Sequence, residues 1–238
     1  KMFQKEFFGH KQGGVCRSDD GCETWTPTIA GLPNNALTSH IVLDPTSPAG
    51  KRTLYITIIN KGVYKSTDDG ATWVEKSNGI DSNNRFTWRL ALLPDGTLYC
   101  VVVAGHMEGD EKPGALYKST DGAETWEKVA LPKDVMDPND LTFDPDGRLY
   151  LSCWPHIVDG KNIGGGVYAS DDGGATWTNI YDPGVHVYTV TVDPQAPSTL
   201  YMTTFHAATM RSDDKGMTWK RLKGANFQWN QRCVPDPH

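Results

Sequence analysis

The sequence has no long apolar segment, no block of basic residues and no metal-binding cysteine motif. No run of apolar residues approaches the roughly 20 that a transmembrane helix needs, which argues against membrane insertion. Acidic residues outnumber basic ones by 29 to 23, giving a formal net charge of −6, so nucleic acid is not expected as a partner. Phosphate-binding loops, dinucleotide fingerprints and serine-nucleophile motifs are absent as well.

Cysteine is scarce and follows no pattern. The 238 residues include five cysteines, without the CxxC spacing of a zinc site. Their odd number leaves at least one without a partner in the chain, and a fold of this size does not depend on disulfides. We therefore expect buried free thiols at Cys16, Cys22, Cys100, Cys153 and Cys233.

What the sequence does contain is an eight-residue motif that recurs five times. Each copy begins with Ser, carries Asp at its third position and ends with Trp. Successive tryptophans are 48, 53, 51 and 42 residues apart, which is the length of a four-stranded propeller blade. The copies occupy residues 18–25, 66–73, 119–126, 170–177 and 212–219.

The motif resembles the Asp-box, or BNR, repeat Ser-x-Asp-x-Gly-x-x-Trp, and the resemblance covers nearly the whole chain. It implies an all-β fold, a β-propeller of four-stranded blades, similar to sialidase-like, xyloglucanase-like and sortilin-type propellers. Two copies depart from the pattern, with Cys22 and Ala123 where Gly is expected and Gly one position earlier. We expect their turns to be slightly shifted but intact.

The motif predicts a structural role for its own residues. A tight hairpin turn leaves backbone N–H groups without strand partners, and a short Asp side chain accepts hydrogen bonds from them. The Trp is expected to bury a large apolar face beside the turn. The structural residues are expected to be Asp20, Asp68, Asp121, Asp172 and Asp214, with Trp25, Trp73, Trp126, Trp177 and Trp219.

The blade alignment predicts one domain spanning residues 1–238. Met2-Phe3 matches the Leu-Tyr that opens the second strand of later blades, and 233–237 matches a first strand and its Asp-Pro turn. We therefore expect five blades, closed by the C-terminal strand joining the N-terminal blade; the alternative is part of a six- to eight-bladed propeller. The expected blades are 1–30 plus 228–238, 38–78, 86–130, 139–181 and 186–223.

Histidines gather at the ends of strands on the propeller face opposite the repeated turns. Imidazole is the commonest metal ligand, so a ring of histidines predicts a transition-metal site for Zn or Cu. The alternative is that related blades carry the same loop residue, which hydrogen-bonds locally. The candidate ligands are His10, His106, His156 and His206.

The same face carries aromatic and charged side chains suited to a ligand site. Aromatic rings offer apolar platforms for sugars, and a glycosidase needs two carboxylates roughly 5 to 9.5 Å apart. Glu108 and Asp140 are the candidate catalytic carboxylates. The candidate ligand-binding residues are Trp88, Arg89, Trp154, Trp229, His40 and His186.

Three functions are compatible with these features. The resemblance favours a carbohydrate-directed protein, a glycoside hydrolase-like enzyme if it is an enzyme, acting on a polysaccharide or glycan outside the cell or in the periplasm. Sialidase activity is not expected, because Arg17 and Arg211 adjoin the repeated turns, on the opposite face. The alternatives are a non-catalytic scaffold for protein or peptide partners and a metal-binding propeller, because fold alone does not set function.

Overall fold

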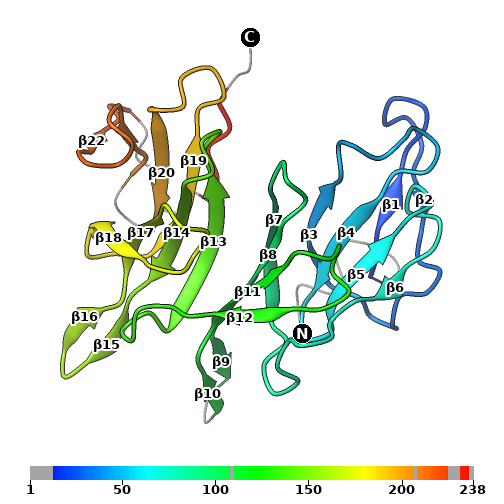
Figure 1. Cartoon of the computed structure of the whole chain (residues 1–238), viewed down its shortest axis with the longest axis horizontal. Helices are drawn as coiled ribbons and strands as arrows, with labels where there is room; N and C mark the ends of the chain where they lie inside the picture. The colour runs from blue at the N-terminus through cyan, green and yellow to red at the C-terminus, as the bar shows by residue number, and fades with distance from the viewer. Residues whose placement is uncertain (1–12, 108–109, 206–207, 225–230, 236–238) are drawn as a thin grey trace. The chain divides into compact units, whose positions relative to one another are not determined.

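All regular structure described in the computed structural model is β-strand (Figure 1). The structure describes residues 13–107, 110–205, 208–224 and 231–235. No helical segment that could cross a bilayer occurs in these ranges. Four sheets have four strands each, and in every one the hydrogen-bonded neighbours follow chain order. This meander is the topology of a propeller blade, so the expected all-β, propeller-type fold is confirmed.

The four sheets follow one another along the chain. The first is β3 (Thr38–Leu43), β4 (Leu54–Ile58), β5 (Gly62–Ser66) and β6 (Val74–Glu75). The second is β7 (Thr87–Leu92), β8 (Leu98–Val102), β11 (Ala115–Ser119) and β12 (Glu127–Val129). The third is β13 (Asp137–Phe143), β14 (Leu149–Trp154), β17 (Gly166–Ser170) and β18 (Thr178–Tyr181). The fourth is β19 (Val187–Val192), β20 (Leu200–Thr204), β21 (Met210–Ser212) and β22 (Lys220–Arg221).

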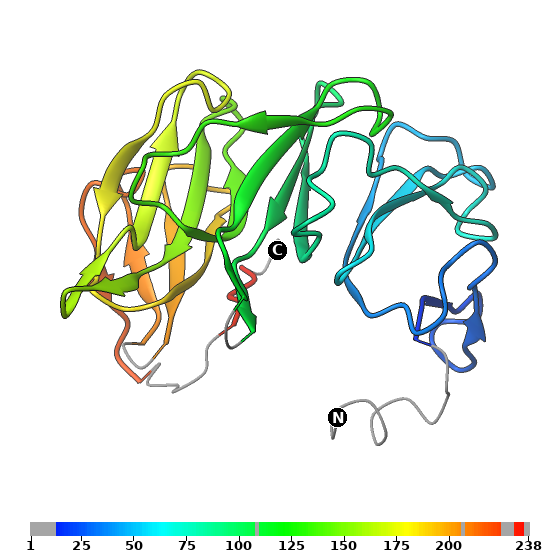
Figure 2. The same cartoon turned by 90° about the horizontal axis from the view of Figure 1, so that it is seen from below.

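Three two-stranded sheets complete the described structure. Two of them are hairpins inserted between the second and third strands of a four-stranded sheet, and the sequence analysis did not predict them (Figures 1 and 2). The third lies before the first four-stranded sheet, where the N-terminal blade was predicted. The strands are β1 (Cys16–Arg17) with β2 (Thr26–Pro27), β9 (Gly105–Met107) with β10 (Asp110–Lys112), and β15 (His156–Val158) with β16 (Lys161–Ile163).

The chain divides into two compact units. The first comprises residues 1–98 and 119–127, and the second comprises 99–118 and 128–238. The single-domain boundary, the number of blades and the ring closure stay predictions.

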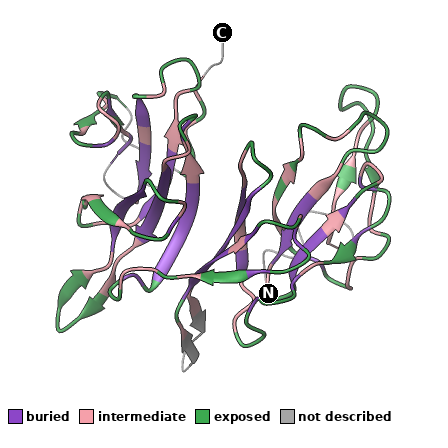
Figure 3. Ribbon diagram, in the orientation of Figure 1, coloured by how far each residue is buried: buried purple, intermediate pink, exposed green. Residues whose placement is uncertain are grey.

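Each unit has its own apolar core. In the first unit, Ile56, Ile58 and Trp73 are buried together. In the second, Val167, Val187, Leu200 and Met202 are all fully buried and join the sheets that contain β17 and β20. Figure 3 shows that burial is concentrated in the inner strands, whereas the β15–β16 hairpin is largely exposed.

The repeated motif forms the same hydrogen-bonded turn in all five copies. In the third copy, Asp121 accepts the Thr125 N–H at 3.0 Å and the Thr125 hydroxyl at 2.6 Å. The Ser119 hydroxyl donates to Asp121 at 2.8 Å and accepts the Ala123 N–H at 2.9 Å. The other four copies repeat these contacts, so each carboxylate is occupied by its own turn.

The expected shift of two of the turns is wrong. Cys22 and Ala123 occupy the same place as Gly70, donating to the Ser hydroxyl four residues earlier. Their φ angles are 74° and 71°, in the left-handed region that usually selects glycine. The Ser and Asp hydrogen bonds therefore hold the turn in register and tolerate a Cβ there.

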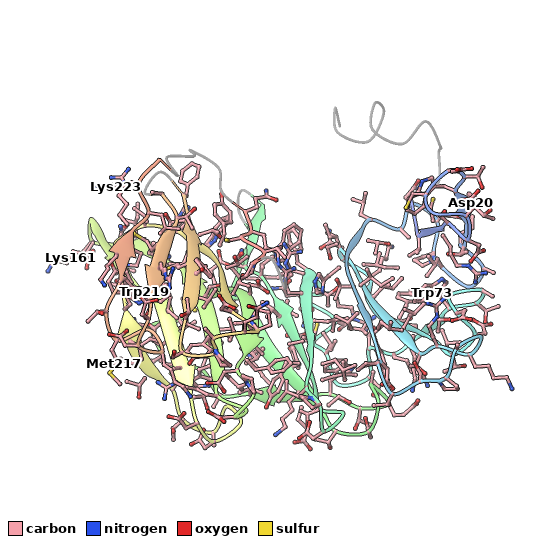
Figure 4. The ribbon with its side chains drawn as sticks, turned by 90° about the horizontal axis from the view of Figure 1, so that it is seen from above. Asp20, Trp73, Lys161, Met217, Trp219 and Lys223 are labelled. Carbon is pink, nitrogen blue, oxygen red and sulfur yellow. The ribbon has the colours of Figure 1, made fainter. Side chains whose placement is uncertain are left out.

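The motif tryptophans differ more than the turns do. Trp73 and Trp126 are 2% and 3% exposed, and each indole N–H donates to a carbonyl of the preceding repeat. Trp25 is 58% exposed, so the expectation of burial is wrong for the first copy. Figure 4 shows Asp20 in that first turn and Trp73, which directly precedes β6 of the sheet that follows it.

The carboxylates of these turns make the stability of the folded chain depend on pH. The Thr and Ser hydrogen bonds hold the pKa of Asp20, Asp121, Asp172 and Asp214 at about 2, below the ordinary value of 3.8, and lower that of Asp68 as well. A pKa lowered by folding contributes stability that is present above the unfolded value, near 4, and is lost as pH falls toward 2. We expect the unfolding free energy, measured by urea titration, to decline through this window.

A matched pair of variants tests the source of the acid dependence. Asp172→Asn removes one turn carboxylate, whereas Asp171→Asn removes its neighbour, which pairs with Arg148 at the surface. The decline below pH 4 should become shallower in Asp172→Asn than in Asp171→Asn. Equal slopes in the two variants would contradict a turn origin.

Hydroxyl groups join the third and the fourth sheet to the chain segment that follows each of them. Ser152 of β14 donates to the Tyr188 carbonyl of β19 at 3.1 Å, and Thr203 of β20 donates to the Gln231 carbonyl at 3.3 Å. The Thr191 hydroxyl adds a second bond, to the Cys233 carbonyl at 2.8 Å. Segment 231–235 therefore lies against β20 as β19 lies against β14, in the place of a first strand. Its pairing with the N-terminal blade stays a prediction, because residues 1–12 lie outside the described part of the chain.

The cysteines are free, as expected, but only some are buried. Cys100 and Cys153 are fully buried, and burial raises the pKa of both thiols. Cys16 and Cys22 are exposed, which corrects the expectation of burial for those two, and Cys233 is half-buried.

Candidate functional site

A cluster of buried acids and stacked aromatic rings lies in the second unit, where strands β13, β14, β19 and β20 begin or end. Its members, called here the aromatic–acid cluster, are Asp137, Asp140, Trp154, His186, Tyr188 and Phe205.

The acids of the cluster sit at the start of β13. Asp137 and Asp140 are 5% and 6% exposed. Asp137 accepts the Ala104 N–H at 2.9 Å, which ties it to the segment after β8, and it pairs across the sheet with Trp154. Asp140 accepts the Leu141 N–H at 3.0 Å. Carboxylates are seldom buried to this extent unless they are paired, so these two acids mark the start of β13 as a candidate site.

A β-bulge shapes this strand. The β13–β14 register shifts between Pro138 and Asp140, leaving Asn139 as the extra residue. The same shift occurs at Ser39 in β3 and at Tyr188 in β19. Because bulges re-aim side chains and often flank active sites, this repeated feature sets the direction of the residues at the strand entries.

The aromatic rings of the cluster pack in a continuous set. Trp154 stacks on the His186 imidazole with centroids 4.5 Å apart and planes at 14°. His186 in turn stacks on Phe205 at 5.6 Å. Tyr188 meets Trp154 edge-on at 5.2 Å and Phe205 at 6.3 Å. Such packing holds the rings in fixed orientations, and Trp154 remains only partly buried.

Backbone and hydroxyl contacts fix the cluster further. The Phe205 N–H donates to the His186 carbonyl at 2.9 Å, and Ser152 bridges the carbonyls of Asp140 and Tyr188 at 3.2 and 3.1 Å. Burial raises the pKa of Tyr188 above its ordinary value of 10, so its hydroxyl stays neutral at physiological pH. The result is a rigid aromatic surface next to two carboxylates, an arrangement suited to stacking a ring-shaped polar ligand.

A second group of predicted ligand-binding residues lies in the first unit. The Arg89 guanidinium lies over the Trp88 ring at 4.8 Å and donates to the Ser39 carbonyl at 3.2 Å. His40 Nδ1 accepts the Leu90 N–H at 3.2 Å. The structure therefore brings Trp88, Arg89 and His40 together, and brings Trp154 and His186 together.

Several predicted site residues lie outside the described part of the chain. These are Glu108, Trp229, His10 and His206, together with the side chain of His106. His156 lies at the base of the β15–β16 hairpin, opposite Ile163. Among the described residues, no group of three or more His, Cys, Asp or Glu side chains is placed to hold a metal ion. The zinc or copper site stays a prediction.

Sequence reasoning missed three members of the cluster. Asp137, Tyr188 and Phe205 were not among the candidate site residues. One signal was present for Tyr188, which occupies the same place in its strand as Trp88 does in β7. Both are aromatic, and the carbonyl of each accepts a hydroxyl from the second strand of the preceding sheet.

The relatives of this chain in sequence include xyloglucanases. The chain is 26% identical to a xyloglucanase of Paenibacillus sp and to the xyloglucanase Xgh74A of Acetivibrio thermocellus, over 88% of its length in both cases. It spans only 23% and 29% of those two proteins. No family model matches the chain.

Solved structures agree on the fold. The Niastella koreensis GH74 enzyme superimposes with a TM-score of 0.69 at 24% identity, over 88% of this chain and 35% of that one. YCF48 bound to D1 peptide gives a TM-score of 0.57 at 18% identity, over 89% and 62%. Because both identities are below 25%, these superpositions show only a shared all-β, propeller-type fold. The xyloglucanases are relatives of this chain in sequence.

Proposed function

We propose that this chain is a carbohydrate-directed, glycoside hydrolase-like propeller domain of the Asp-box type, and that the aromatic–acid cluster binds a β-linked polysaccharide. The observation that carries the proposal is the partly exposed Trp154, stacked on His186 beside the buried Asp137 and Asp140. Xyloglucan is the first polymer to test, because the sequence relatives are xyloglucanases.

The cluster provides the two elements that sugar recognition requires. A flat aromatic face contacts the apolar face of a pyranose ring, and the carboxylates accept hydrogen bonds from its hydroxyl groups. Because Trp154 is locked by His186 and Tyr188, little side-chain entropy is lost on binding. The site is thus pre-formed for a neutral, ring-shaped ligand.

Hydrolysis would require one carboxyl to donate a proton and a second carboxylate to act as base or nucleophile. Asp140, predicted from the sequence, and Asp137, added by the structure, are the two candidates in the described residues. Glu108 stays a prediction. An extracellular or periplasmic location fits a polysaccharide ligand and also stays a prediction.

Binding and product release can be measured on the same protein. We expect the chain to bind xyloglucan in affinity electrophoresis and to be released by xyloglucan oligosaccharides. Release of shorter oligosaccharides, followed by chromatography, should disappear in Asp140→Asn or Asp137→Asn while binding persists. Absence of binding to xyloglucan and to other neutral β-glucans would refute the proposal.

The non-catalytic alternative gives a different result in the same experiment. Binding without any product release, unchanged in both Asp variants, would identify a carbohydrate-binding domain. Binding of a peptide but of no polysaccharide would identify a scaffold, in line with the fold shared with YCF48 bound to D1 peptide. A melting temperature raised by Zn²⁺ or Cu²⁺ would support the metal alternative.

A further inference from the structure

We propose that a groove beside the aromatic–acid cluster binds the carboxylate of an acidic sugar unit, so that the preferred ligand is a polysaccharide that carries uronic acids. This inference rests on the proposed function and goes beyond it, because the sequence relatives are named for xyloglucan. The groove, called here the lysine groove, has a volume of about 410 Å³ and is lined by residues 113–115, 128–133 and 135. All of these residues belong to the second unit.

The floor of the lysine groove is apolar and fixed by backbone contacts. The Gly114 N–H donates to the Met136 carbonyl at 2.7 Å, which joins the base of the β9–β10 hairpin to the segment before β13. A Cβ at Gly114 would lie 2.6 Å from the Val102 carbonyl oxygen, so the close approach requires glycine. The Val135 N–H closes a turn on the Pro132 carbonyl at 2.9 Å. The groove is therefore formed before any ligand arrives.

Two lysines provide the charge of the groove. Lys128 on β12 and Lys133 in the following turn both line it, and neither forms an ion pair with any described residue. The nearest acids in sequence are Glu127 and Asp134. Neither of them lines the groove. Two ammonium groups without an ion-pair partner among the described residues, over an apolar floor in a chain of net charge −6, favour an anion with an apolar face.

The position of the groove indicates a sugar rather than a separate ligand. Val135 lines the groove, and Asp137, two residues later, belongs to the aromatic–acid cluster. Two residues of extended chain span roughly 7 Å, which is on the scale of one sugar unit. One polysaccharide chain could thus place a neutral ring on Trp154 and an acidic unit in the groove. A uronic acid combines the required apolar ring face with a carboxylate.

The test compares two polymers that differ only in their carboxyl groups. Glucuronoxylan and the same polymer after reduction of its carboxyls to alcohols should be assayed by isothermal titration calorimetry at low salt. We expect about tenfold tighter binding to the carboxylated polymer, equivalent to about 1.4 kcal/mol, because its carboxylate would pair with two exposed lysines. Added salt should reduce the preference.

Lysine variants test whether the lysine groove causes the preference for the carboxylated polymer. The double variant Lys128→Gln with Lys133→Gln should bind both polymers equally, at the affinity of the wild type for the reduced polymer. Lys161→Gln is the matched control, because Lys161 is an exposed lysine of the same unit that does not line the groove (Figure 4). Equal wild-type affinity for the two polymers, or a preference that survives the double variant, would overturn the inference.

The failure of this inference can be told apart from that of the proposed function. Binding of xyloglucan and of both xylans with equal affinity would refute the role of the lysine groove and leave the proposed carbohydrate site intact. Absence of binding to any polysaccharide would refute both proposals. Oligo-glutamate bound through Lys128 and Lys133, with no polymer preference, would assign the groove to acidic peptides and contradict the sugar.

Discussion

Replacing Gly164 with Ala is expected to destabilise the chain by about 3 kcal/mol, the largest stability effect predicted for a single added methyl group. A Cβ at this position would lie 1.7 Å from the Asp134 carbonyl oxygen and 2.6 Å from its carbonyl carbon. These are backbone atoms, so no side chain can move aside to relieve the clash. Gly164 also has φ of +72°, which adds roughly 1 kcal/mol of strain for an L-residue.

Gly160 provides the matched control for this substitution. It belongs to the same β15–β16 hairpin region and has φ of +74°, but a Cβ there meets nothing within 4 Å. Gly160→Ala should therefore cost about 1 kcal/mol, the conformational part alone. Urea titration monitored by tryptophan fluorescence measures both values. Equal losses in the two variants would show that segment 130–136 does not pack against Gly164.

The Gly164 variant should also affect ligand binding. Asp134 lies in the turn that carries Lys133 and Val135, so a backbone shift there would disturb the lysine groove. The stability loss and the loss of polymer preference should appear together in Gly164→Ala and be absent or small in Gly160→Ala.

Trp154→Ala is expected to weaken polysaccharide binding at least tenfold, or about 1.4 kcal/mol. The substitution removes the ring that is stacked on His186 and partly exposed. Truncating an aromatic anchor at the centre of a binding surface commonly costs more than 1 kcal/mol. Trp154→Phe keeps an aromatic face and should retain part of the affinity.

Trp177 is the control for the loss of an indole. It is also half-buried in the second unit, but its N–H donates to the Gly174 carbonyl of its own turn, at 3.1 Å. Trp177→Ala should lower the melting temperature without changing the affinity for the polysaccharide. If Trp154→Ala folds and binds as the wild type does, the aromatic–acid cluster is not the sugar site.

Much of the local structure follows from short-range chemistry. The Ser and Asp of each repeat satisfy the turn that contains them within four residues, so the motif predicts the hairpin without knowledge of the rest. The alternating strands and their order within each four-stranded sheet followed in the same way. The turns at Cys22 and Ala123 were mispredicted because hydrogen bonds outweigh the modest cost of a left-handed Cβ.

The candidate site could not be predicted to the same extent. His186 and Trp154 are 32 positions apart, and their stacking depends on how β19 packs against β14. The β-bulge that singles out Asn139 and Tyr188 has no signature in composition. The inserted hairpins were not predicted, because their strands are only three residues long.

The sequence by itself determined the repeated turns, the four-stranded sheets and their order, because those depend on contacts between near neighbours in the chain. Only the tertiary structure decided which acids are buried, which rings stack and where the two lysines of the groove meet an apolar floor. Burial and stacking depend on contacts between strands that are far apart in sequence, and no local pattern encodes those contacts.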